Sequence, residues 1–238
     1  MVHGLWIRLI GTVICAGIGI VLAGCQGTAV STQESVLIAT PTFTASPLQT
    51  SIQTEVTDVR ISMEVPAGWR SQQARYGVLL IEKSGYYHPD NKLSGIQMYV
   101  FVRAVDDFSI PASTNPNDAW NILDHIASVP GYIGDAAVSR PKGFKWHGID
   151  GAYYMLTDSH HNLSLVVALI LPQPKRLVAF NISCPQERAA DIRAVLPDLL
   201  MGLTLNDMTI DSSLVEALPD PLEFPAYEYT YPEPTATS

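Results

Sequence analysis

Residues 163–171 read Leu-Ser-Leu-Val-Val-Ala-Leu-Ile-Leu, and this run decides the fold class of the chain. A half-buried strand alternates apolar and polar side chains, whereas this run is apolar at nearly every position. Such a pattern is typical of a strand that is buried on both of its faces. We therefore expect residues 163–171 to form a central strand of a sheet.

The segments on either side of this run predict further strands. Residues 176–184 alternate, so that Val178, Phe180, Ile182 and Cys184 share one apolar face. Residues 152–158 precede the run and are separated from it by a polar turn. Other segments predicted as strands are 59–65, which ends in a Pro-Ala-Gly-Trp turn, 76–82, 96–105, 136–140 and 144–147.

The sequence also predicts two amphipathic helices. The first follows Asn115-Pro116, an Asn cap with proline at the first helical position, and Pro130-Gly131 ends it. The second begins at Pro185 and contains Pro197, which we expect to kink or break it. The apolar residues at helical spacing are Ala119, Ile122, Leu123, Ile126 and Val129 in the first helix, and Ala189, Ile192, Leu196, Leu199 and Leu203 in the second.

Residues 61–69, Ile-Ser-Met-Glu-Val-Pro-Ala-Gly-Trp, are similar to a motif of the PsbP-like family. The Gly148–Gly151 turn before a strand and the closing amphipathic helix extend this resemblance over residues 55–205. The resemblance implies an α+β fold, an α/β/α sandwich with a central, mostly antiparallel sheet and two main helices. Members of this family mostly bind other proteins or have no known function, and bacterial lipoproteins are among them.

The start of the chain is typical of an exported lipoprotein. Residues 9–23 are apolar or small, follow Arg8, and are fewer than the roughly 20 residues needed to span a bilayer. Leu22-Ala23-Gly24-Cys25 resembles the bacterial lipobox, so we expect cleavage before Cys25 and its acylation with palmitate or similar chains. The alternatives are an ordinary export signal or an uncleaved short anchor.

Composition divides the chain into four parts. Residues 1–24 are the expected signal peptide, and residues 25–54 are the lipidated cysteine with a Ser/Thr-rich disordered tether. Residues 55–205, with 15 acidic and 13 basic side chains, are the expected globular domain. Residues 206–238 hold seven acidic residues and no Lys or Arg, and we expect a mostly disordered tail. No basic patch is visible, which argues against nucleic-acid binding.

One polar cluster suggests metal chemistry. Residues 158–162 read Asp-Ser-His-His-Asn, and the carboxylate of Asp158 with the imidazoles of His160 and His161 would suit zinc. The cluster lies between two predicted strands, however, where polar turn residues are expected. Adjacent histidines on a strand also point to opposite sides, so a hairpin turn is the favoured interpretation.

Two further features have a functional and a structural interpretation. Cys184 would lie at the start of a helix, where a thiol pKa can be lowered, but its apolar strand face favours a buried, inert thiol. Trp69, Trp120 and Trp146 could line a pocket for a small molecule, although tryptophans more often belong to the core or its edge.

The remaining titratable residues are not expected to form a site. Asp106 and Asp107 are adjacent, and neighbouring carboxylates at a strand end diverge. His88, His125 and His147 are expected at the surface. The chain has no Gly-x-Ser-x-Gly, phosphate-loop, His-Glu-x-x-His or calcium-loop motif, so we expect no cofactor.

These observations favour a lipoprotein at the outer face of the cell membrane. Its anchor would be the lipid on Cys25, and its folded domain would be a non-catalytic module that binds or assembles a protein of unknown identity. A metal-dependent enzyme using Asp158, His160 and His161 is one alternative. A receptor with a pocket lined by the tryptophans is the other.

Overall fold

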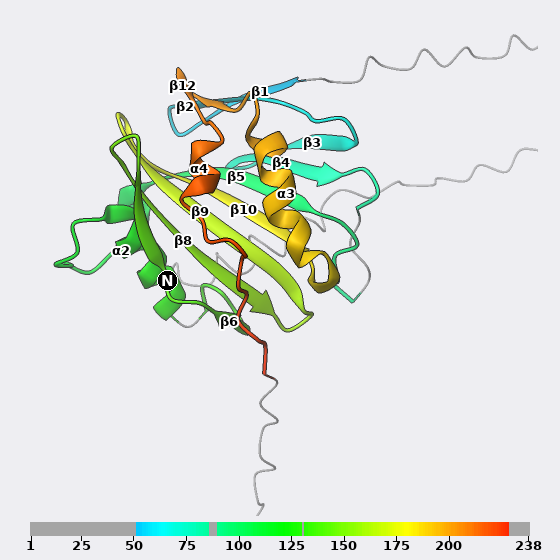
Figure 1. Cartoon of the computed structure of the whole chain (residues 1–238). Helices are drawn as coiled ribbons and strands as arrows, with labels where there is room; N and C mark the ends of the chain where they lie inside the picture. Colours follow the sequence, from blue (N-terminus) through cyan, green and yellow to red (C-terminus); the bar gives the residue numbers. More distant parts are fainter. Residues whose placement is uncertain (1–50, 86–89, 130, 229–238) are drawn as a thin grey trace, which may run out of the picture.

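The computed structural model describes residues 51–85, 90–129 and 131–228, and in this part an antiparallel sheet of eight strands forms the centre (Figure 1). The strand order is β3-β4-β5-β10-β9-β8-β6, with β7 paired to β8 beside β6. The strands are β3 (Trp69–Ala74), β4 (Gly77–Glu82), β5 (Gln97–Ala104), β6 (Ala136–Val138), β7 (Lys142–Trp146), β8 (Ile149–Asp158), β9 (Asn162–Pro172) and β10 (Lys175–Pro185).

Strand β9 confirms the prediction of a central, doubly buried strand. Every residue of β9 except Pro172 at its end is buried. It pairs with β10 along its full length and with β8 on its other edge. Ala168 lies between Ala152 of β8 and Ala179 of β10, so three small residues lie side by side across the sheet.

The two main helices cover opposite faces of this sheet (Figure 1). Val166, Ala168 and Ile170 of β9 belong to the core cluster under α2 (Asp118–Ser128). The residues between them, such as Val167 and Leu169, belong to the cluster under α3 (Ala189–Leu200). The alternation of side chains along a strand produces this division. The predicted α+β class and the α/β/α arrangement are therefore confirmed.

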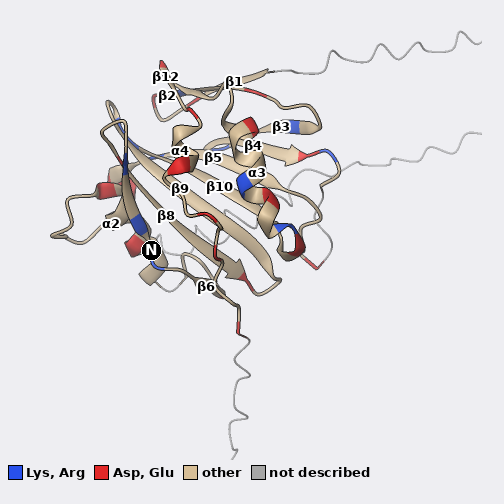
Figure 2. Cartoon of the chain, viewed as in Figure 1, with Lys and Arg blue, Asp and Glu red and all other residues tan. Residues whose placement is uncertain are grey.

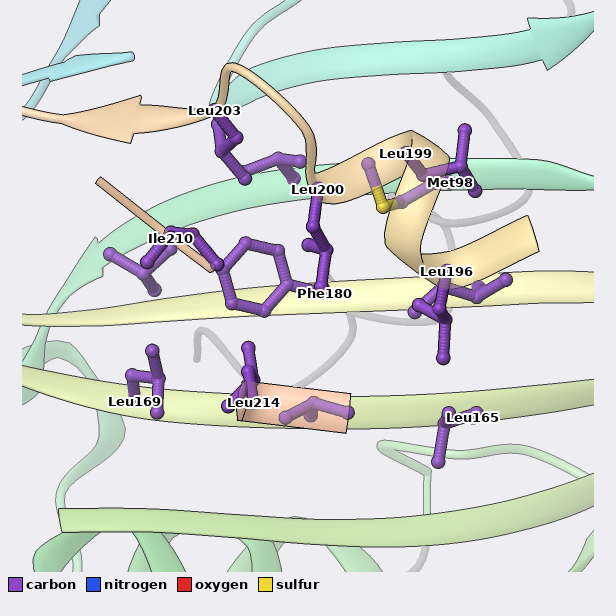
Figure 3. Close-up of a cluster of buried hydrophobic side chains, with 14 of the residues drawn as sticks. Met98, Leu165, Leu169, Phe180, Leu196, Leu199, Leu200, Leu203, Ile210 and Leu214 are labelled. Atoms are coloured by element: carbon purple, nitrogen blue, oxygen red, sulfur yellow. The ribbon is translucent and has the colours of Figure 1, made fainter. Parts of the chain in front are cut away.

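The core under α3 is the larger of the two. Phe180 is 1% exposed and projects from β10 between α3 and the C-terminal segment. Figure 3 shows its ring among Leu200, Ile210 and Leu214, three residues that follow β10 in the chain. Ile210, Leu214, Val215 and Leu218 of the C-terminal segment are therefore part of this core.

A second, smaller sheet of four strands lies over the same face as α3 (Figure 1). Its first strand buries alternate residues, Ile52, Thr54 and Val56. Residues 51–54, predicted to belong to the disordered tether, are therefore part of a folded strand, of which Ser51, Gln53 and Glu55 form the exposed face. The strands are β1 (Ser51–Val56), β2 (Val59–Glu64), β11 (Thr204–Leu205) and β12 (Met208–Thr209).

The C-terminal segment corrects a larger prediction. Residues 206–238 were expected to be mostly disordered, yet residues 206–228 are folded onto the domain and include β12 and the short helix α4 (Ser213–Glu216). Ile210, Leu214 and Leu218 are each 5% exposed or less. The acidic and proline-rich composition predicted disorder, although the segment contains three spaced apolar side chains whose burial stabilises it.

Polar contacts also hold this segment. The Arg193 guanidinium on α3 donates to the backbone oxygens of Val215, Leu218 and Pro219, at 2.9–3.3 Å. Farther along, the Thr157 hydroxyl donates to the backbone oxygen of Pro225 at 2.6 Å. These bonds satisfy carbonyl groups that regular secondary structure leaves without partners.

Two helix predictions need smaller corrections. Helix α2 is capped by Asn117 and not by Asn115, since the Asn117 side chain accepts a bond from the backbone N–H of Trp120 at 2.8 Å. Pro197 does not break α3, which continues to Leu200. In addition, the sequence predicted only a turn where β3 begins at Trp69.

The packing of the C-terminal segment can be tested by mutation. Leu214→Ala should lower the free energy of unfolding by about 2–5 kcal/mol, because it leaves a cavity in the core. Glu216→Ala on the same helix is the matched control and should change stability by less than about 0.5 kcal/mol. Urea unfolding of the full chain measures both. Equal stability of the two variants would contradict the packing of residues 206–228.

Candidate functional site

The proposed metal ligand Asp158 organises the turn between β8 and β9. Its Oδ1 accepts hydrogen bonds from the backbone N–H groups of His160 and Asn162, at 2.9 and 2.8 Å. Its Oδ2 accepts a further bond from the Asn162 side-chain amide at 2.9 Å. His161 has a φ of 60° and its ring lies edge-on to Tyr227. This is the geometry of a hairpin turn closed by an aspartate.

In the part of the chain that the structure describes, no group of three or more His, Cys, Asp or Glu side chains is placed to hold a metal ion. His160 and His161 are neighbours in the turn, and the carboxylate beside them already accepts three hydrogen bonds. The turn interpretation therefore accounts for the Asp158 contacts without a metal.

Cys184 has the buried position that its strand face predicted. Its side chain is fully buried on the α3 side of β10. Burial raises the pKa of the thiol to about 12, and the nearby Arg188 offsets this only in part. The group is therefore a protonated thiol near neutral pH, which is a poor nucleophile.

The three tryptophans do not form one stacking surface. Trp120 packs on the α2 face of the sheet, and its indole N–H donates to the backbone oxygen of Pro141 at 3.0 Å. Trp146 is 4% exposed on the opposite face. Trp69 also packs on that face, at the start of β3. A single pocket lined by all three indoles, as the receptor hypothesis requires, is therefore not formed.

A Ser-His-Asp cluster, which the sequence did not predict, lies where α4 meets the turn after β7. Nε2 of His147 is 3.1 Å from Asp211 Oδ2 and 3.4 Å from Ser213 Oγ. In a catalytic triad the acid and the nucleophile contact opposite ring nitrogens, whereas here both contact the same nitrogen. Ser213 Oγ also accepts a bond from the Trp146 indole at 2.9 Å. The cluster attaches the C-terminal segment to this turn.

The other candidate residues suggested by the sequence are dispersed, or they lie in parts of the chain that the structure does not describe. Asp107 forms an ion pair with Arg103 at 2.8 Å, and Asp106 takes no part in it. The His125 ring lies edge-on to Tyr132. His88, the lipobox and Cys25 lie outside the described residues.

A groove of about 690 Å³ lies beside the start of β1. One wall is the turn between β2 and β3, and the other is the end of α3 with the residue after it. Ser51, the first residue of β1, lines it as well. The lining residues are Ser51, Glu64, Val65, Pro66, Ala67, Trp69, Asp198 and Met201.

The groove combines apolar and acidic side chains. Met201 is 61% exposed and is the one large apolar side chain of the described chain that is so exposed. Glu64 and Asp198 are exposed, and neither carboxylate forms an ion pair or a hydrogen bond with another described residue. In Figure 2 the end of α3 that leads to the small sheet carries an acidic residue.

Glycine at position 202 shapes this groove. Gly202 has a φ of 68°, a conformation that favours glycine, and a Cβ there would lie 2.8 Å from Cγ of Glu64. The Glu64 side chain therefore packs directly on the backbone that follows Met201. Sequence reasoning missed the groove because its walls are far apart in the chain. The one local signal was the Met201-Gly202 pair, because a glycine just after a helix indicates that the chain turns there.

Within the described residues, no helix is both long and apolar enough to cross a membrane. No protein-family model matches the chain, and no curated protein matches it in sequence.

Several solved structures show a weak similarity to this chain. Cyanobacterial PsbP from Synechocystis sp. PCC 6803 has a TM-score of 0.39 and 11% identity, over 77% of this chain and 98% of that one. The Ran-binding protein Mog1p of Saccharomyces cerevisiae has a TM-score of 0.38 and 11% identity, over 69% of this chain and 97% of that one. LpqN of Mycobacterium tuberculosis, which is involved in cell envelope biogenesis, has a TM-score of 0.43 and 8% identity, over 66% of this chain and 90% of that one.

A PsbP protein is thus among the structures that this chain resembles, and membership of the PsbP-like family stays a prediction from sequence. The α+β fold class is established by the strand order and by the helices on both faces of the sheet.

The burial of Cys184 predicts its reactivity. In the folded full chain at pH 8, Cys184 should resist a maleimide for hours, because its thiol is both inaccessible and protonated. In concentrated urea it should react within minutes. Peptide mapping by mass spectrometry distinguishes it from Cys15 and Cys25. Rapid labelling of Cys184 without denaturant would contradict the buried position.

The Asp211 contacts predict a pH dependence. Hydrogen bonds from Ser213, chiefly from its hydroxyl, lower the pKa of the Asp211 carboxyl. Because the carboxyl pKa is lower in the folded state than in the unfolded state, where it is about 4, ionised Asp211 stabilises the fold at pH values above about 4. This stability is lost as the pH falls through the pKa of the folded state. Wild type should exceed Asp211→Asn in stability at pH 6, and the difference should shrink below about pH 4. Urea unfolding at both pH values, with Glu216→Gln as control, measures this. A constant difference would contradict the assignment.

Proposed function

We propose that this chain is a bacterial cell-envelope lipoprotein whose folded domain binds a protein partner at the outer face of the membrane. Two features support the anchor. Leu22-Ala23-Gly24-Cys25 has the residue types of a lipobox, and residues 26–50 then lead to the domain. A flexible chain of 25 residues has a root-mean-square span of about 25–30 Å, which would keep the domain close to the bilayer.

The position of the groove carries the proposal of a binding role. Ser51 is both the first residue of β1 and part of the groove lining. A tether that enters beside the groove would hold this surface near membrane partners and raise its effective concentration there. Met201 is exposed in the groove that Trp69 also lines, which is typical of an interaction surface, since Met and aromatic residues are enriched in interfaces.

The residues that suggested catalysis have structural contacts instead. Asp158 accepts three bonds within its hairpin, and Cys184 is a buried thiol. At the start of α4, the backbone N–H of Ser213 donates a hydrogen bond to Asp211 Oδ1 at 3.0 Å. No observation among the described residues favours the metal-dependent enzyme over the binding module.

The anchor is tested by labelling cells with radioactive palmitate. Wild type should be labelled and should sediment with membranes, whereas Cys25→Ser should lose both properties. Cys184→Ser is the matched control and should keep both. Undiminished labelling of Cys25→Ser would contradict the proposed anchor.

The binding role is tested by photo-crosslinking in living cells. A photoreactive residue at position 201 should give one dominant protein adduct, because this position lies in the groove. The same residue at position 216, which is exposed on α4, is the control and should not give that adduct. The yield at position 201 should fall in the Cys25→Ser background. Adducts with lipid alone at position 201 would contradict a protein-binding role for the groove.

A further inference from the structure

We infer that the groove binds a short segment of a partner protein in which an apolar side chain is flanked by Lys or Arg. The groove is the one lined by Trp69, Met201, Glu64 and Asp198, between the β2–β3 turn and the end of α3. This inference rests on the proposed function, because it states the chemistry of the partner that the anchored domain would hold.

The apolar part of the groove is suited to one buried side chain. The volume of the whole groove, about 690 Å³, is within the range of about 300–1,000 Å³ for binding pockets. Trp69 and Val65 are half-buried, while Met201 is mostly exposed. An incoming aliphatic side chain would cover Met201 and remove apolar surface of both partners from water. The flexible thioether of Met201 can adapt to different partner side chains.

Charge complementarity selects a cationic partner. The groove lining contains two carboxylates and no Lys or Arg. Neither the Glu64 nor the Asp198 carboxylate forms an ion pair or a hydrogen bond with another described residue, so their charges are available to a ligand. The backbone oxygens at the C-terminal end of α3 add negative potential on the same side. A Lys or Arg at the rim would interact favourably with all three.

The position of Asp198 supports this assignment independently of the groove volume. Asp198 lies in the last turn of α3, and this turn contains no basic residue. An acidic side chain at a helix C-terminus is unfavourable, because it meets the negative end of the helix dipole. Asp198 therefore does not stabilise its own helix, and a cation held against it would relieve the repulsion.

The Glu64 carboxylate is positioned rather than freely extended. Its Cγ lies 2.8 Å from the position that a Cβ on residue 202 would take, so the side chain packs on the Gly202 backbone. The two carboxylates thus project from separate walls, one from the end of β2 and one from α3. An anionic membrane surface is the less favourable occupant, since two unpaired carboxylates at the rim would be repelled by it.

Binding is measured by fluorescence anisotropy with full-length protein in neutral detergent micelles. The probe is a labelled 11-residue peptide with a central Leu flanked by two Lys on each side in an otherwise Gly/Ser sequence. Two matched peptides replace the four Lys by Glu, or the Leu by Ser. The Lys/Leu peptide should bind at least tenfold more tightly than either, and its affinity should fall as salt is raised.

Variants of the groove locate the site. The double variant Glu64→Gln/Asp198→Asn should weaken binding about tenfold, which corresponds to about 1.4 kcal/mol. Met201→Ser should weaken it comparably. The control Glu216→Gln/Glu223→Gln removes two exposed carboxylates from the C-terminal segment and should leave the affinity unchanged. Circular dichroism confirms that each variant is folded.

Three results would overturn the inference: equal affinity for the Lys and Glu peptides, equal weakening by the groove and control variants, or no binding of the Lys/Leu peptide. Cys25→Ser protein that binds anionic vesicles through Met201 would assign the groove to the membrane instead. The peptide experiment does not depend on acylation. Failure there with intact palmitate labelling would reject only the partner chemistry, whereas loss of labelling would reject only the anchor.

Discussion

The structure depends on the burial of β9 on both of its faces. An isolated sheet face can remain in water, but ten successive buried residues require cover on each side. Helix α2 covers one face, and α3 with the small sheet and α4 covers the other. The unequal size of the two layers follows, because a single helix of 11 residues is sufficient over the small alanines at the centre of the α2 side.

The larger layer is assembled from both ends of the domain. Strand β2 pairs with β1 from the N-terminal side and with β11 from the C-terminal side. The Arg60–Asn206 backbone pairing reinforces this junction at 2.7 Å. The groove exists because of this junction, since it lies between the start of β1, the end of β2 and the end of α3. Pairing of β11 with β2 and formation of the candidate binding surface are thus coupled.

The parts of the fold that sequence could predict are those with strong periodicity. The β9 run, the alternation in β10 and the apolar face of α2 each reflect one local pattern, and each is confirmed. The C-terminal segment was missed because Ile210, Leu214 and Leu218 lie among polar residues, of which Asp211, Ser212 and Glu216 are exposed. Composition describes the exposed surface of such a segment and not its few buried contacts.

The candidate site was less predictable than the fold. Histidine, cysteine and tryptophan attract attention by residue type, yet Asp158, Cys184 and Trp146 are held by structural contacts. Glu64 and Met201 are inconspicuous in sequence and become neighbours only through the pairing of β2 with β11. Juxtaposition of distant segments carries no local signal, so only the tertiary structure brings the groove together.

The central claim is that this groove recognises an apolar side chain flanked by cations. The most direct measurement is NMR of the full chain in micelles, with labelled methionine methyls and tryptophan indoles, during titration with the Lys/Leu peptide. The account predicts saturable shifts of the Met201 methyl and the Trp69 indole, with the buried Met98 methyl and the Trp120 indole unchanged. Shifts confined to Trp120 on the opposite face, or none at Met201, would contradict it.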